Sequence, residues 1–299
     1  MAMTNNAPHI RGKYTDSELC EYARTNDIAI EDIFFRWTIE NILYAFSSSD
    51  SPDEIIVGSS IFSAVLHEES GYKRSVTLYY CPHETGANYL GDPHNLDKFI
   101  TNMLSPNANI SSYKIQQFDN LTTFDINYVF NHRLIPLSFN FYNLYVSYDQ
   151  IRSVDIDLPL KAKSIRLYEL IPETILVRSF ISFFTYLELI SDMRILYDLY
   201  TIISCESLSG RKVVSSLSQS IKESNLEVDR DICNLFRSYT NNPYLKKKWR
   251  AYIKRNHFSF TPWEDVISLI TDFLEKIIDY VISDSIFLED WMPQLKRFM

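Results

Sequence analysis

Glycine and cysteine are both scarce in this chain, and each shortage excludes a class of site. Only 6 glycines occur among 299 residues. None lies in a GxGxxG or GxxxxGK[ST] pattern, which argues against the common glycine-rich dinucleotide and P-loop phosphate sites. The 4 cysteines form no CxxC pair, so we expect reduced thiols rather than a disulfide framework or a zinc site.

Long apolar runs are also missing. No stretch of about 18 apolar residues exists, and the longest candidate, residues 174–190, is interrupted by Arg178 and Glu188. The chain does not begin with the basic-then-apolar layout of a secretory signal. We therefore expect a cytoplasmic protein without a membrane partner. With 46% apolar and 22% charged residues, the composition is that of one large or two ordinary globular domains.

The charge is unevenly distributed. The net charge is −9, yet residues 211–260 carry 11 basic and 4 acidic residues, a balance of +7, so the rest carries −16. The basic residues are densest between positions 244 and 255, where no acid occurs: Lys246, Lys247, Lys248, Arg250, Lys254 and Arg255. Such a cluster predicts either a nucleic-acid surface or a solvated helix face.

Hydrophobic periodicity divides the chain into a mixed part and a helical part. Two helices are expected within residues 16–46, broken near Asn26 and Asp27, and further helices over 61–66 and 96–104. Strands are expected at 54–57, 74–81, 113–118, 122–130, 137–148, 154–158 and 165–168. After Pro172 the pattern predicts only helices, at 172–190, 192–205, 211–223, 228–240, 243–255 and 262–282. Thr261 is expected to cap the last of these, with Pro262 at its first position.

These elements predict an α+β protein with three regions. They are an N-terminal helical extension (1–48), a mixed-sheet α/β domain (49–170) and an all-helical C-terminal domain (171–299). A small sheet with helices packed against it should form the middle region.

One segment predicts phosphate chemistry. A buried strand ends at Val57 and is followed by Gly58, Ser59 and Ser60, then by a helix and a second strand. Glycine lets the backbone approach a triphosphate, and serine with a helix N-terminus can donate hydrogen bonds to phosphate oxygens. Nucleotidyltransferases begin in this way, and their second strand presents Asp-x-Asp to hold two Mg²⁺ ions.

The segments Ile56–Ser60 and Tyr72–Tyr80 resemble the AbiEii-type nucleotidyltransferase-like proteins. The resemblance continues through residues 166–178, and then through Arg194-Ile-Leu-Tyr-Asp-Leu-Tyr200, its most specific piece. Residues 247–250 and 260–277 are similar to the family's C-terminal helices.

The resemblance implies a polymerase-beta-type nucleotidyltransferase domain followed by helices, with a cleft between them. It implies a role in bacterial toxin–antitoxin or phage-defence systems, in which active relatives transfer a nucleotide to RNA such as tRNA. It also implies nucleotide-binding positions at Gly58, Ser59, Ser60, Arg74, Arg178, Arg194 and Asp198, with Arg178 and Asp198 close together. A cognate antitoxin or another defence protein is an implied partner.

The chain departs from the family pattern at the metal-binding positions. Thr77 and Tyr79 stand where the family has Asp-x-Asp, and neither is a good ligand for Mg²⁺, which prefers carboxylate oxygen. Arg178 replaces the family's lysine, and Ile195 replaces an acid. We therefore expect a catalytically degenerate protein that requires no cofactor and binds a nucleotide, RNA or a protein partner.

Two other readings remain open. An active nucleotidyltransferase, with Mg²⁺ and an NTP, would need a rearranged metal site, for which Asp155 and Asp157 are the candidates, although they fit the solvent face of an edge strand better. A purely structural interaction protein would leave the cleft empty.

Arg194 and Asp198, four residues apart, can also pair with each other on one helix. A metal site in the loop that holds Cys81, His83, Asp92 and His94 has weaker support.

Overall fold

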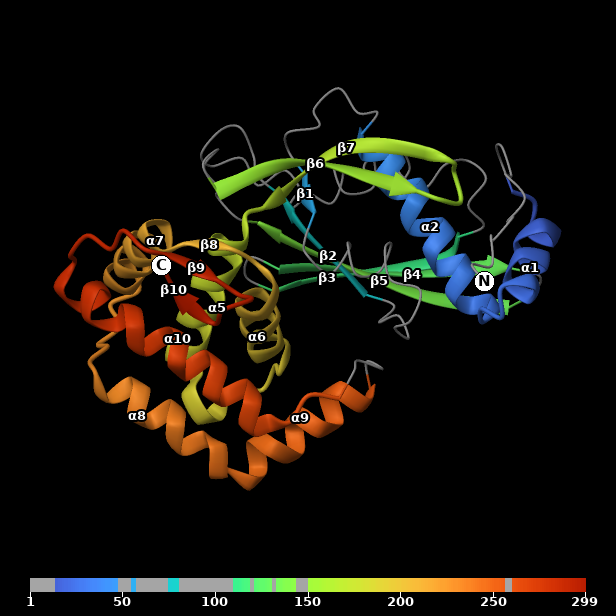
Figure 1. Cartoon of the computed structure of the whole chain (residues 1–299). Helices are drawn as coiled ribbons and strands as arrows, with labels where there is room; N and C mark the ends of the chain where they lie inside the picture. The colour runs from blue at the N-terminus through green and yellow to red at the C-terminus, as the bar shows by residue number, and fades with distance from the viewer. Residues whose placement is uncertain are drawn as a thin grey trace, which may run out of the picture. The chain divides into compact units, whose positions relative to one another are not determined.

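The protein was analysed as a computed structural model, which describes residues 14–47, 55–57, 75–80, 110–118, 121–130, 133–143, 150–255 and 260–299. The chain divides into two compact units, Met1–Leu170 (unit 1) and Ile171–Met299 (unit 2). Each is described by itself. The first two helices belong to unit 1, together with the sheet (Figure 1).

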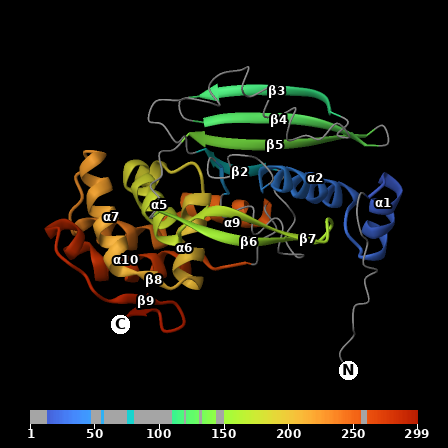
Figure 2. The ribbon, with the colours of Figure 1, turned by 90° about the horizontal axis from the view of Figure 1, so that it is seen from above.

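A seven-stranded mixed sheet is the framework of unit 1. Its strands are β1 (Ile55–Val57), β2 (Ser75–Tyr80), β3 (Ile110–Phe118), β4 (Leu121–Phe130), β5 (Arg133–Asn143), β6 (Ile151–Leu158) and β7 (Lys163–Leu170). They lie in the order β3-β4-β5-β2-β1-β7-β6. The β1–β7 and β2–β5 pairs are parallel and the others antiparallel. All seven expected strands are present, and Figure 2 shows β3, β4 and β5 side by side. The helices expected over 61–66 and 96–104 lie outside the described residues.

Two helices precede the sheet, α1 (Asp16–Thr25) and α2 (Ile30–Ser47). Thr15 caps α1 through a reciprocal capping box with Glu18. The expected break is confirmed, since Asp27 takes a positive φ of 54° between the helices. Helix α2 packs against β7.

The β6–β7 hairpin alternates buried and exposed positions. Ile156 and Leu158 are buried, whereas Asp155 and Asp157 between them are exposed. Because β6 is the last strand of the sheet, the prediction that these two acids occupy the solvent face of an edge strand is confirmed.

Six helices form the body of unit 2. They are α5 (Pro172–Tyr186), α6 (Arg194–Cys205), α7 (Gly210–Glu223), α8 (Asp231–Ser238), α9 (Pro243–Arg255) and α10 (Trp263–Ser283). Helix α10 contacts α6, α7, α8 and α9 (Figure 1). No helix within the described ranges combines the length and the apolar character that crossing a bilayer requires.

Three buried tryptophans tie the helices of unit 2 together. The indole N–H of Trp249 donates to the Thr261 carbonyl at 3.0 Å, and that of Trp263 donates to the Tyr239 carbonyl at 2.8 Å. Trp291 donates to the Ile203 carbonyl at 2.7 Å. Each ring is at most 2% exposed, so every large apolar surface is buried while its one polar group stays hydrogen-bonded.

The expectation of an all-helical C-terminal domain is wrong. Unit 2 also contains a three-stranded sheet in the order β10-β9-β8, made of β8 (Leu208–Ser209), β9 (Asp290–Met292) and β10 (Arg297–Phe298). Strands of two or three residues are too short to show alternation. The sheet forms because the chain end returns to the start of α7.

Gly210 permits that return. A Cβ at this position would lie 2.1 Å from the Glu289 carbonyl oxygen and 2.6 Å from the Phe287 ring. Only a residue without a side chain therefore fits there.

Two helix boundaries also differ from expectation. Helix α5 ends at Tyr186 rather than at 190, because Leu187 takes a positive φ of 47° and a 3₁₀ turn, η3 (Leu187–Leu189), follows. Pro262, rather than Thr261, is the N-cap of α10. Its fixed φ suits a position just before the helix as well as the first helical one.

A buried carboxyl on α2 holds the β6–β7 turn. Glu40 is fully buried and accepts hydrogen bonds from the backbone N–H groups of Leu160 (3.3 Å) and Lys161 (3.0 Å). The Arg36 guanidinium lies 3.6 Å away on the same helix. Burial raises the pKa of the Glu40 carboxyl to about 7, against the opposing effects of the two N–H groups and Arg36.

This pKa predicts a stability that depends on pH. Because the folded-state pKa lies above the ordinary value of 4.5, the stabilisation is complete below pH 4.5 and is lost as the pH rises through 7. Urea unfolding gives the free energy of unfolding of the wild type and of Glu40→Gln. As the pH rises from 4.5 to above 7, the wild type should lose roughly 3 kcal/mol of this free energy relative to the variant.

Glu21→Gln, which alters an exposed carboxyl on α1, is the matched control and should run parallel to the wild type. A wild-type to Glu40→Gln difference that stays constant with pH would contradict the assignment.

Candidate functional site

The predicted Gly-Ser-Ser segment follows strand β1 in the sequence. Gly58, Ser59, Ser60 and Arg74 lie outside the described residues. The strand that leads to this segment is described, and its last residue, Val57, pairs with Leu78 of β2 on one side and with Glu169 of β7 on the other. These two strands therefore supply the groups nearest to the end of β1.

The two positions that replace the family's Asp-x-Asp lie in the middle of the sheet. Thr77 and Tyr79 are two residues apart on β2, so they occupy the same face of the strand. Thr77 pairs with Asn140 of β5, whereas Tyr79 pairs with Tyr142 of β5 and Ile56 of β1. None of these described partners is a carboxylate, so the donor set does not suit Mg²⁺.

Glu169 is an acid beside Val57, the last residue of β1, that sequence analysis did not single out. It is 7% exposed, and its carboxylate lies 2.5 Å from the guanidinium of Arg152, its cross-strand partner on β6. The sequence does hold a signal, because Glu169 continues the phase of the buried positions Ile165 and Leu167 along β7. An acid in phase with buried residues indicates a paired carboxylate.

The alternative metal candidates are engaged in a different way. Asp155 forms two hydrogen bonds with Arg166, at 2.8 and 3.2 Å, on the exposed face of the hairpin. This contact holds the pKa of Asp155 below its ordinary value. Asp157 accepts a hydrogen bond from Ser164. Among the described residues, no three His, Cys, Asp or Glu side chains gather closely enough to hold a metal ion.

One further acid of the sheet, Asp125, lies on β4 beside Lys114 of β3. The loop with Cys81, His83, Asp92 and His94 lies outside the described residues.

In unit 2, the candidates that the family resemblance implies lie on two packed helices. Arg178 is half-buried on α5, and Arg194 and Asp198 are half-buried on α6, which packs against α5. Asp192 precedes α6, accepts a hydrogen bond from the Arg194 backbone N–H at 2.9 Å and lies 3.6 Å from its guanidinium.

Tyr252 of α9 completes this cluster. Burial raises the pKa of its phenol, and the charges of Asp198 and Asp192 raise it further, whereas Arg194 lowers it. Its ring lies 6.0 Å from that of Tyr197 on α6. Arg194 and Asp198 are therefore neighbours of Tyr252, and their charges act on its phenol.

Helix α9 carries the predicted basic cluster, but its cations are not equivalent. Lys246 pairs with Glu264 of α10, and the Lys248 ammonium donates to the Ile190 carbonyl at 3.0 Å. The premise that no acid lies near the cluster is therefore wrong for Lys246, because folding brings the start of α10 alongside. Lys247, Arg250 and Lys254 are exposed. Of Arg255 the structure describes only that it ends the helix.

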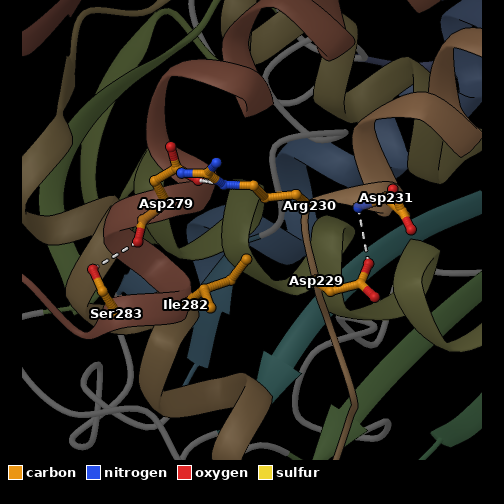
Figure 3. A pocket seen from close by; sticks show the side chains of 6 residues that line it. All are labelled: Asp229, Arg230, Asp231, Asp279, Ile282 and Ser283. Atoms are coloured by element: carbon orange, nitrogen blue, oxygen red, sulfur yellow. Dashed lines mark hydrogen bonds and ion pairs between the residues drawn. The ribbon is translucent and has the colours of Figure 1, made fainter.

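A shallow hollow of about 570 Å³ lies between the start of α8 and the end of α10 (Figure 3). Sequence analysis did not identify it. Arg230 pairs with Asp279, while the Asp231 backbone N–H donates to Asp229 at 2.9 Å. Ser283 donates to the Asp279 carbonyl at 2.7 Å. These contacts hold the hollow's polar groups to one another.

The β6–β7 hairpin offers two cross-strand pairs for comparison. Arg152→Ala should cost about 2 kcal/mol in the free energy of unfolding, because it strips the counter-charge from a buried carboxylate. Arg166→Ala should cost less than about 1 kcal/mol, because both partners of its pair are exposed. Urea unfolding of the two variants tests this, and adding Glu169→Gln to Arg152→Ala should recover part of the loss. Equal costs for the two arginines would contradict a buried role for Glu169.

Comparisons with known proteins give distant structural matches alone. No family model matches the chain, and no curated protein does. The structure of JHP933 from Helicobacter pylori matches with a TM-score of 0.49 and 9% identity, over 86% of this chain and 97% of that one. A provisionally assigned nucleotidyltransferase from H. pylori matches with a TM-score of 0.49 and 9% identity, over 85% and 99%. At this level of similarity neither match assigns a family, substrate or reaction to the chain.

Proposed function

We propose that this chain is a nucleotidyltransferase-fold protein of the AbiEii type that has lost the transfer reaction and acts by binding a nucleotide, RNA or a protein partner. The biological setting in this proposal is a bacterial toxin–antitoxin or phage-defence system. A cognate antitoxin or another defence protein is the partner that the setting suggests. The sequence segments around Gly58 and from Arg194 to Tyr200 support the family part of the proposal.

One observation carries the loss of catalysis. Two-metal phosphoryl transfer needs carboxylates that fix the ions against the triphosphate and the attacking oxygen. Thr77 and Tyr79 occupy the two positions, and their described neighbours in the sheet are Asn140, Tyr142 and Ile56. Hydroxyl, phenol, amide and aliphatic side chains supply no carboxylate, which supports the proposed loss of the metal pair.

Among the described residues, two acids near this part of the sheet are already engaged by arginines. Asp155 is bound by Arg166 on an exposed edge strand, and Glu169 is bound by Arg152. An acid that moved to a metal would have to give up its arginine. This favours a degenerate protein over an active enzyme with a rearranged site.

The cationic part of a phosphate site is better preserved. Arginine keeps its charge at every physiological pH and holds phosphate oxygens through a two-pronged contact. Arg178 and Arg194 are both half-buried in unit 2, where solvent screens them less than a fully exposed side chain. Binding of a phosphorylated ligand without catalysis needs no more than such groups.

The test is a transfer assay. Purified protein with each labelled NTP, Mg²⁺ or Mn²⁺ and total RNA should produce no labelled RNA, because each 1.36 kcal/mol of lost transition-state stabilisation lowers the rate about tenfold. Purified partner proteins serve as a second set of acceptors. Labelling should equal that of a heat-denatured control.

Variants assign any labelling that does occur. Activity that disappears in Asp155→Ala or Asp157→Ala, but not in the exposed control Asp229→Ala, would establish a rearranged metal site and overturn the proposal. Activity that survives those changes and is lost in Asp198→Ala would overturn it in favour of a site on α6.

A further inference from the structure

The solvent side of α9 is uniformly basic. Lys247, Arg250 and Lys254 are exposed and follow an i, i+3, i+7 spacing, so they lie on one face of the helix. The three positions span about 10 Å along the axis, at 1.5 Å per residue. Helix α9 contains no acidic residue. Glu264 of α10, which pairs with Lys246, is also close enough to Arg250 for their charges to interact.

Several other cations of unit 2 are held in ion pairs. Lys222 pairs with Asp284, Arg230 with Asp279 and Arg237 with Glu275. The opposite face of α9 packs inward through Leu245, Trp249, Tyr252 and Ile253, which are buried. The helix is therefore held firmly by its apolar face while the basic face stays in solvent.

Aromatic rings accompany these charges. Tyr244, one turn before Lys247 and Lys248, is 57% exposed, and the Lys248 ammonium lies 4.4 Å from its ring centroid. Phe260 is 69% exposed. Its neighbour Thr261 accepts the indole hydrogen bond of Trp249, on the buried side of α9.

We propose that this basic–aromatic face, formed by Tyr244, Lys247, Arg250 and Lys254, binds a single strand of nucleic acid. The three cations contact successive phosphates, and the Tyr244 ring stacks on a base. Single-strand binding sites combine these two features, because every base offers a π-face and every nucleotide a phosphate. The proposal rests on the proposed function and specifies the ligand and surface of a protein that binds without transfer.

The composition of the face argues against the other polyanionic surfaces. An interfacial membrane helix needs large aliphatic or aromatic side chains along its length, whereas Ala251 is the largest aliphatic residue on the exposed part of α9. An acidic protein partner would contact only the cations, so its binding would make no use of the exposed Tyr244 ring.

Fluorescence anisotropy with a labelled single-stranded RNA of mixed sequence, in EDTA, tests the proposal. Three phosphate contacts predict a slope of about −2 in log affinity against log salt, so affinity should fall about 20-fold between about 50 and 200 mM salt. The triple variant Lys247→Gln, Arg250→Gln, Lys254→Gln should lose most of this slope. Tyr244→Ala should weaken binding on the order of 5- to 150-fold, while Tyr244→Phe, which keeps the ring, should not.

The matched control removes the same charge elsewhere on unit 2. Arg211→Gln, Lys212→Gln, Lys276→Gln changes three exposed cations on α7 and α10 and should leave the affinity within about twofold, since distant exposed charges are screened. Equal loss in both triple variants would overturn the proposal, because the effect would then be one of net charge. Binding of polyglutamate or of anionic vesicles as tight as that of RNA would also overturn it.

A DNA strand of the same sequence separates backbone binding from contacts to the 2′-hydroxyl, and binding of either strand through the α9 face supports the surface. Failure here and failure of the proposed function can be told apart. Nucleic-acid binding together with nucleotide transfer would keep the surface and reject the degenerate protein. Absence of both binding and transfer would reject the surface and leave a protein that binds a nucleotide or another partner.

Discussion

A divalent cation such as Mg²⁺ prefers carboxylate oxygen as its ligand. This preference limits the metal chemistry that the central strands of unit 1 can support. The sheet places Thr77 and Tyr79 on β2, between β1 and β5, with Asn140, Tyr142 and Ile56 as their register partners. A hard cation gains little from such ligands, whereas a phosphate can still be held by arginine and by backbone N–H groups. The proposed loss of transfer rests on the lack of a carboxylate among these described register partners.

Two buried acids of unit 1 are accommodated in different ways, since burial favours the neutral form of Glu40 whereas Glu169 keeps a counter-charge. Glu40 holds a turn through two backbone N–H groups, and Glu169 is held by Arg152. The exposed cations of α9 remain in solvent, where they need no buried counter-charge. Buried acids thus serve the fold, and the exposed cations remain available to a ligand.

Much of the architecture could be predicted from the sequence because the relevant patterns are long. The run over 122–130 indicated β4, a shorter run over 154–158 indicated β6, and the stripe from Val266 to Val281 indicated α10. The three short strands of unit 2 could not be predicted, because two or three residues carry no period and the pairing of Leu208 with Trp291 is fixed by tertiary packing. The same limit applies to the Lys246–Glu264 pair, which joins residues on two helices.

The residue types of the candidate site could be predicted from the sequence, whereas the residues that surround them could not. Sequence could show that the Asp-x-Asp positions hold Thr77 and Tyr79, but only the register shows which residues flank them. Glu169 was overlooked because an isolated acid in a strand is read as exposed, whereas its phase with Ile165 and Leu167 puts it on the buried face. The division of α9 into engaged and exposed lysines likewise depends on what packs against the helix.

Mn²⁺ binding in the presence of a nucleotide, followed by electron paramagnetic resonance, tests the central claim most directly, since Mn²⁺ substitutes for Mg²⁺ at oxygen sites. The wild type should bind no more Mn²⁺ than the free nucleotide does, whereas Thr77→Asp with Tyr79→Asp should gain a protein-bound, nucleotide-dependent ion. A wild-type protein that binds Mn²⁺ as tightly as this double variant would contradict the account.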